Sequence, residues 1–139
     1  MIYLDTSVAL AHLLAEDRSP PRQLWSAPLI SSRLLQYEIW NRIHARGLTG
    51  SHREAVVALL DRIATLELTP VVLARALEPF PVPVRTLDAL HLSSLEFLRH
   101  RGQDVRLATY DHRQEEVARR LGSAFPADQT PLRPPAPGR

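Results

Sequence analysis

Four acidic side chains stand in mostly apolar segments of this chain, where a carboxylate is costly. They are Asp5 in MIYLDTSVAL, Glu38 in LLQYEIW, Asp88 in TLDALHL and Asp111 in LATYDHR. Burial disfavours the charged form of a carboxyl group, and like charges at short range raise one another's pKa. A divalent metal ion relieves both costs, and carboxylate-bound metals act on phosphate esters. The four residues therefore predict a metal site with phosphodiester chemistry.

The composition limits the class of protein and the kind of metal ligand. The chain has 139 residues, of which 45% are hydrophobic, which suits one domain with a sizeable core. It has no cysteine, and its six histidines show no HxxxH or HExxH spacing, so oxygen atoms are the expected metal ligands. No stretch resembles a signal peptide or approaches ~18 uncharged apolar residues. We therefore expect no membrane span and a location in the cytoplasm.

The charged residues give only weak evidence about a partner. All 17 basic residues are arginine, and the pI is about 9.7 although the net charge at pH 7 is only +2. The planar guanidinium group suits bidentate contacts with phosphate, which agrees with an RNA partner. Enrichment in Arg, Ala, Leu and Pro together is equally typical of a GC-rich genome, so charge does not decide the function.

Short β-like runs alternate with helical runs along the chain, the pattern of an α/β fold with a central parallel sheet flanked by helices. Strands are predicted at residues 2–4, 28–31, 67–69 and 105–109. Helices are predicted at about residues 6–15, 33–46, 51–65, 71–77, 86–100 and 112–121, with a short one after Pro20 and Pro21. No internal repeat or second domain is evident.

Several element ends carry local signals. Gly47 is a C-terminal cap signal for the helix at 33–46. Ser51 followed by Glu54 forms a capping-box pattern, which predicts that the next helix begins at Ser51 and runs to about Thr65. The final stretch, PADQTPLRPPAPGR, has too little apolar content to pack. We therefore predict a folded domain at 1–125 and a Pro-rich, disordered tail at 126–139.

The predicted elements direct the four acids towards one cleft. Asp5 and Asp111 lie at or just past the carboxyl ends of strands, where open α/β sheets bind their ligands. Asp88 begins a helix and shares a face with the leucines that follow it and with His91, which we expect to be a packing residue rather than a general base. Glu38 lies in mid-helix beside an apolar stripe. All four side chains are placed to converge.

Each acid also has an ordinary structural explanation. Asp5 and Asp111 could cap the helices that follow them. Glu38 could pair with Arg42 at i+4 on a solvated face, and Asp88 could do no more than complement the dipole of its helix. No single position decides between the two explanations, and only the combination of all four favours the metal site.

In order and spacing, residues 1–125 resemble the PIN-domain ribonucleases, and among them the VapC-type toxins of bacterial toxin–antitoxin pairs. MIYLDTSVAL is similar to the first motif of that family, RTLDALHL to the central motif and TYD to the closing T-x-D element. The matching residues are Asp5, Ser7, Glu38, Asp88, Thr109 and Asp111. Gln114 is a departure, since family members usually carry Leu or Phe three residues after the closing acid, and it predicts looser packing of the last helix.

The resemblance implies an active site with one or two Mg²⁺ or Mn²⁺ ions. The three aspartates would be metal ligands, directly or through water, and the glutamate would bind a second ion or position the water. The two hydroxyl residues would orient these groups, and nearby arginines are candidate RNA contacts, although surface arginines often serve solubility alone. The expected site residues are Asp5, Glu38, Asp88 and Asp111, supported by Ser7 and Thr109, with Arg42 and Arg85 as the phosphate contacts.

The resemblance further implies a metal-dependent endoribonuclease that acts as the toxin of a VapBC-type pair. A VapB-like antitoxin would place an arginine-bearing tail in the acidic cleft, and a homodimer is expected, with the helix predicted at 51–65 serving both core and interface. Two alternatives remain open. One is a catalytically inactive PIN-like domain that binds RNA or protein. The other is a phosphatase of the haloacid dehalogenase type, which would need a second Asp where this chain has Ser7.

Overall fold

Four parallel strands form one sheet at the centre of the described structure. The computed structural model describes residues 1–16 and 19–123. The strands are β1 (Ile2–Leu4), β2 (Leu29–Ser32), β3 (Ile63–Leu66) and β4 (Arg106–Ala108), in the order β3-β2-β1-β4. Ile2 pairs with Leu29 on one side and with Arg106 on the other, so β1 is a central strand. Because the strands run in the same direction, their carboxyl ends meet at one edge of the sheet.

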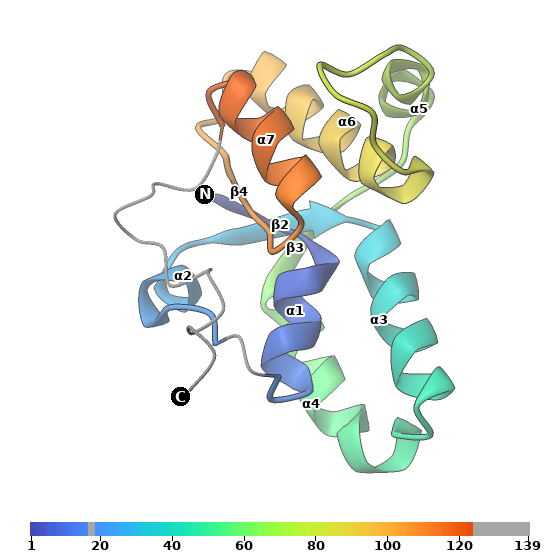
Figure 1. The fold of residues 1–139 in the computed structure, drawn as a ribbon. Helices are drawn as coiled ribbons and strands as arrows, with labels where there is room; N and C mark the ends of the chain where they lie inside the picture. Colours follow the sequence, from blue (N-terminus) through green and yellow to red (C-terminus); the bar gives the residue numbers. More distant parts are fainter. Residues whose placement is uncertain (17–18, 124–139) are drawn as a thin grey trace, which may run out of the picture.

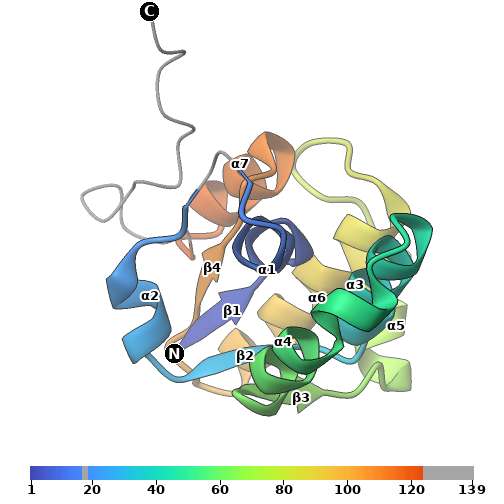
Figure 2. The same ribbon diagram turned by 90° about the horizontal axis from the view of Figure 1, so that it is seen from below.

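Helices cover both faces of this sheet (Figure 1). On one side lie α5 (Pro70–Ala76), α6 (Thr86–His100) and α7 (His112–Arg120). On the other lie α1 (Thr6–Leu13), α2 (Arg22–Ser26), α3 (Leu34–Ala45) and α4 (Thr49–Asp61). Seen from below in Figure 2, α1 lies between α2 and the α3–α4 pair. This arrangement confirms the predicted α/β fold with a parallel sheet flanked by helices.

Side chains of the central strand alternate between two hydrophobic cores. Ile2 and Leu4 contribute to the core with α1, α3 and α4, whereas Tyr3 contributes to the core with α6 and α7. None of the three is more than 6% exposed. Successive strand residues point to opposite faces, so a strand covered on both sides must be apolar throughout. This apolar run ends at Leu4, and the next residue is Asp5.

The stretch from residue 48 to residue 69 differs from the prediction. Leu48 is the N-cap of α4 and no side chain caps this helix, so the predicted capping box of Ser51 and Glu54 does not form. The helix ends at Asp61, and the residues predicted to complete it form strand β3 instead, which makes the strand predicted at 67–69 wrong as well. Ile63 is buried and pairs in register with β2, and this tertiary pairing outweighs the local helical pattern.

Other predicted elements are confirmed. β1 and α6 have the predicted bounds, and the remaining helices and strands differ by a few residues at their ends. Gly47 has a φ of 66°, the left-handed conformation expected of a helix-ending glycine. No helix in residues 1–16 and 19–123 is both long and apolar enough to cross a membrane. The tail predicted at 126–139 lies outside the described residues.

Candidate active site

Asp5 lies at the junction of β1 and α1, at the carboxyl edge of the sheet. Leu4 pairs with Ala108 on the neighbouring strand β4, so the residues that follow the two strands lie side by side. The Asp5 N–H donates to the Ala108 carbonyl at 3.0 Å, and the residue is only 3% exposed. The register of the sheet therefore determines where this buried acid lies.

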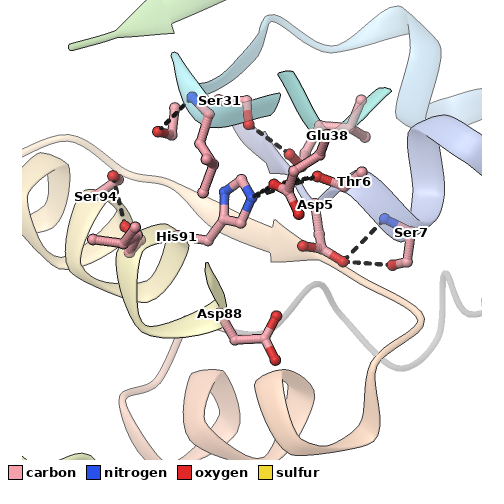
Figure 3. Close-up of polar contacts among 12 residues, drawn as sticks. Asp5, Thr6, Ser7, Ser31, Glu38, Asp88, His91 and Ser94 are labelled. Carbon is pink, nitrogen blue, oxygen red and sulfur yellow. Dashed lines mark hydrogen bonds and ion pairs between the residues drawn. The ribbon is translucent and has the colours of Figure 1, made fainter. Parts of the chain in front are cut away.

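Hydroxyl and backbone donors hold one oxygen of the Asp5 carboxylate. Oδ2 accepts from the Ser7 N–H at 3.2 Å, from the Ser7 hydroxyl at 2.5 Å and from the Thr109 hydroxyl at 3.0 Å. Figure 3 shows the two bonds from Ser7. The backbone bond makes Asp5 the N-cap of α1, so the capping explanation is correct for this residue. Both predicted supporting hydroxyls contact the first acid.

A glutamine joins the other oxygen of Asp5 to Asp88. Asp88 lies in the first turn of α6. The Gln114 side-chain nitrogen donates to Asp5 Oδ1 at 3.1 Å and to Asp88 Oδ1 at 2.9 Å. Gln114 is 1% exposed, so the predicted looser packing of the last helix at this position is wrong. Gln114, the residue that departs from the family pattern, therefore contacts two of the predicted site residues.

The electrostatic environment of Asp88 reflects its acidic neighbours. Burial, together with the negative charges of Asp111 and Asp5, raises the pKa of Asp88 from 3.8 to about 6. Such a rise means that the folded chain disfavours the charged form of this carboxyl group. A cation placed among these residues would reverse that penalty, and carboxylate oxygens are the ligands that Mg²⁺ prefers.

Glu38 contacts a buried histidine and a threonine. His91 Nε2 lies 2.5 Å from Glu38 Oε1, and the Thr6 hydroxyl donates to the same oxygen at 2.8 Å (Figure 3). A carboxylate can only accept, so Nε2 carries the proton. Burial opposes the charged form of His91, but the bond to Glu38 and the charge of Asp5 outweigh it and raise the pKa of His91. The alternative pairing of Glu38 with Arg42 is not observed.

A buried tyrosine contacts the other nitrogen of His91. The Tyr3 hydroxyl lies 2.8 Å from His91 Nδ1 and accepts from the Ser32 N–H at 3.2 Å. Burial raises the pKa of Tyr3 above its ordinary value, so the hydroxyl stays protonated. The chain of contacts from Tyr3 through His91 to Glu38 therefore links β1, α6 and α3, and it fixes the direction of the Glu38 carboxylate.

Replacement of Tyr3 by Phe is expected to lower the free energy of unfolding by about 1–3 kcal/mol, because it leaves a buried backbone N–H without its acceptor. Urea denaturation followed by circular dichroism measures this change. Tyr37→Phe is the matched control, since Tyr37 is 63% exposed and its replacement should change stability by less than ~0.5 kcal/mol. Equal stability of Tyr3→Phe and the wild type would contradict the role given to the hydroxyl.

Asp111 caps α7 and still influences the other acids. Its Oδ1 accepts from the N–H groups of Arg113 at 2.9 Å and Gln114 at 3.0 Å. Its own N–H donates to the Thr109 hydroxyl at 2.9 Å. The capping explanation is therefore correct for Asp111 as well. Its charge nevertheless contributes to the raised pKa of Asp88, so capping does not remove the residue from the site.

The predicted acids share one edge of the sheet but do not form a compact cluster. Within the described ranges, no three Asp, Glu or His side chains stand close enough together to hold a metal ion. Asp5 and Asp88 are joined through Gln114, whereas Glu38 is directed to His91 and one oxygen of Asp111 to the start of α7. The carboxylate oxygens and their mutual repulsion fit a divalent cation. The Gln114 amide now bonds the oxygens of Asp5 and Asp88, so it must move away for an ion to bind them.

The candidate phosphate-binding arginines lie on the same helices as two of the acids and form no ion pair with them. Arg42 follows Glu38 by one turn of α3, and Arg85 is the N-cap residue of α6, three positions before Asp88. Both side chains are exposed. Neither forms an ion pair with another residue of the described chain, so both remain candidates for phosphate contacts.

Sequence reasoning missed Thr6 and Gln114 and treated His91 as packing alone. Thr6 follows the first acid directly, and its position predicts only the start of a helix. Gln114 lies on the buried stripe of α7 with Val117 and Ala118. Gln114 therefore stands on the stripe of this helix that carries its apolar residues. A polar side chain at such a position needs a hydrogen-bond partner, and this signal could have identified Gln114 as a site residue.

Together these features define an α/β protein with an acidic site at the carboxyl edge of a parallel sheet. The chain belongs to the PIN domain family, which it matches over residues 2–120. It is 33% identical to ribonuclease VapC46 of Mycobacterium tuberculosis over 127 residues, which cover 88% of this chain and 94% of that protein. It is 29% identical to ribonuclease VapC47 of the same species over 129 residues, covering 88% and 93%.

A solved structure supports the fold. The crystal structure of Mycobacterium tuberculosis VapC20, described as a toxin that cleaves the sarcin–ricin loop, matches 84% of this chain and 94% of that chain. The TM-score is 0.56 and the sequence identity 19%. The resemblance to VapC-type PIN domains is thus confirmed, and the haloacid dehalogenase alternative has no support. Ribonucleases of the PIN domain family generally depend on a divalent metal ion.

Proposed function

We propose that this chain is a divalent-metal-dependent endoribonuclease that acts as the toxin of a VapBC-type toxin–antitoxin pair. The observation that carries the proposal is the pairing of two carboxylates, Asp5 and Asp88, whose oxygens face one amide group at the carboxyl edge of the sheet. The similarity to ribonuclease VapC46 over 88% of the chain supports the same activity and the same kind of substrate.

Asp5, Asp88 and Asp111 would hold a Mg²⁺ or Mn²⁺ ion through their carboxylate oxygens, directly or through water. When bound, such an ion supplies charge neutralisation at the phosphate and lowers the pKa of a water molecule. Ser7 and Thr109 bond Oδ2 of Asp5, which leaves Oδ1 to the Gln114 amide that also bonds Asp88. These hydroxyls therefore orient the first acid.

Glu38 would orient the attacking water. Its Oε1 accepts from Thr6 and from His91, which leaves Oε2 for a water molecule. The Glu38 side chain is 20% exposed, so it is not sealed from solvent. Because His91 and Thr6 fix Oε1, the direction of Oε2 is fixed as well, and this oxygen would accept a hydrogen bond from the water.

Arg42 and Arg85 flank this site and would bind the RNA backbone, since exposed guanidinium groups suit phosphate oxygens. A VapB-like antitoxin would inhibit the enzyme by placing an arginine among the same carboxylates, which form charge-assisted bonds with guanidinium. We also propose a homodimer. Val56 and Leu59 of α4 are buried in the core while Val57 is 45% exposed, so only the outer face of this helix is available to a second copy.

Cleavage of end-labelled total RNA by the purified chain tests the proposed function. Discrete fragments are expected with Mn²⁺ or Mg²⁺, and none in EDTA, because the carboxylates alone cannot neutralise the phosphate. A protein that binds RNA equally well in EDTA and never cuts it with Mn²⁺ would instead be an inactive PIN-like binding domain. Mapping the fragment ends would identify the RNA that is cut.

A further inference from the structure

We propose that Gln114 is a positioning residue that competes with the metal ion for the oxygens of Asp5 and Asp88. The inference rests on the proposed function, because it concerns how the same site takes up a divalent ion. The amide nitrogen lies 3.1 Å from Asp5 Oδ1 and 2.9 Å from Asp88 Oδ1. An ion that binds both oxygens must lie between them, where the amide now lies, so the amide has to be displaced.

The amide group is a neutral substitute for a cation at this position. Its nitrogen carries two hydrogens with partial positive charge, and each has a carboxylate oxygen as its acceptor. Ionised carboxylates only accept hydrogen bonds, so the nitrogen and not the oxygen of the amide must face them. The bridge reduces the repulsion between Asp5 and Asp88 and keeps the two side chains ordered when no ion is bound.

Nothing else in the described structure holds the Gln114 amide. Its Oε1 is buried and has no hydrogen-bond partner among the described residues. A buried carbonyl oxygen without a hydrogen-bond donor is unfavourable, so Oε1 does not help to hold the amide. Among the described residues, the two bonds from the amide nitrogen to the carboxylates therefore determine the orientation of the amide. Once a cation neutralises them, no other hydrogen bond retains the amide. Gln114 therefore weakens ion binding but does not prevent it.

Gln114→Met tests the competition, since methionine has a similar length and volume but no N–H group. The EDTA-treated variant is expected to bind Mn²⁺ about tenfold more tightly than the wild type in isothermal titration calorimetry, which corresponds to ~1.4 kcal/mol. Its Tm without metal is expected to fall by ~3–5 °C, because the repulsion between the two carboxylates is no longer reduced. A residue that only fills space would lower the Tm without tightening ion binding.

Two further variants complete the test. Gln103→Met is the matched control, because Gln103 is exposed beyond the end of α6 and should change neither quantity. Gln114→Leu serves if the methionine variant does not fold, since it also lacks side-chain N–H donors and should likewise bind Mn²⁺ more tightly than the wild type. A wild-type chain that binds no Mn²⁺ would refute the metal site itself. A wild type that binds Mn²⁺ as tightly as Gln114→Met, or more tightly, would overturn this inference alone.

Discussion

Asp5→Asn is expected to reduce RNA cleavage by about 10³-fold or more, because loss of a metal-binding carboxylate removes several kcal/mol of transition-state stabilisation. Asn keeps the shape of the side chain, and its carbonyl oxygen can still accept from Ser7 at the start of α1. The first-order rate constant for cleavage of a labelled RNA, measured with excess enzyme and saturating Mn²⁺, gives the size of the effect.

The same experiment separates a loss of chemistry from a loss of folding. The circular dichroism spectrum of Asp5→Asn should match that of the wild type, since the sheet register and the N-cap are retained. Asp104→Asn is the matched control, because its side chain is 88% exposed and makes only a weak contact with Arg106 at 3.6 Å, and it should cleave RNA at the wild-type rate. Wild-type rates for both Asp5→Asn and Asp88→Asn would refute the proposed site.

Local signals in the sequence were sufficient to predict that the acids gather at one edge. A continuous apolar run predicted β1, and its end at Leu4 placed the first carboxylate at the start of a helix. The alternation of strands and helices predicted a parallel sheet, in which strand ends must share an edge. Capping α1 and the proposed metal binding are not alternatives for Asp5, because a helix N-cap at the end of a strand already lies at that edge.

These local signals could not predict contacts between residues that are far apart in the sequence. Gln114 reaches Asp5 across 109 positions of sequence, and this contact depends on how α7 packs beside α6. The pairing of His91 with Glu38 likewise depends on the approach of α3 to α6, which no local pattern encodes. Strand β3 was missed for a related reason, since its extended conformation is stabilised by pairing with β2 and not by local preference.

Asp88→Asn is expected to stabilise the metal-free protein above pH 6 while it abolishes cleavage. Burial and the charges of Asp111 and Asp5 raise the pKa of Asp88 from 3.8 to about 6. Between these two values the folded chain binds more protons than the unfolded chain, so the free energy of unfolding falls as the pH rises through this range. Asn is neutral at every pH and avoids this loss. Because Asp88 is only partly buried, we expect a screened gain of about 1–2 kcal/mol at pH 7.5.

Urea denaturation of the EDTA-treated proteins at pH 4, 6 and 7.5 measures the gain, which should be small at pH 4 and largest at pH 7.5. A gain that does not depend on pH would indicate better packing rather than relief of charge, and a less stable variant at pH 7.5 would contradict the prediction. Addition of Mn²⁺ at ~100 times its Kd should reverse the order, because binding stabilises only the wild type, by ~2.7 kcal/mol. The negative charge of Asp88 is thus expected to lower the stability of the metal-free protein, and the same charge would attract the proposed cation.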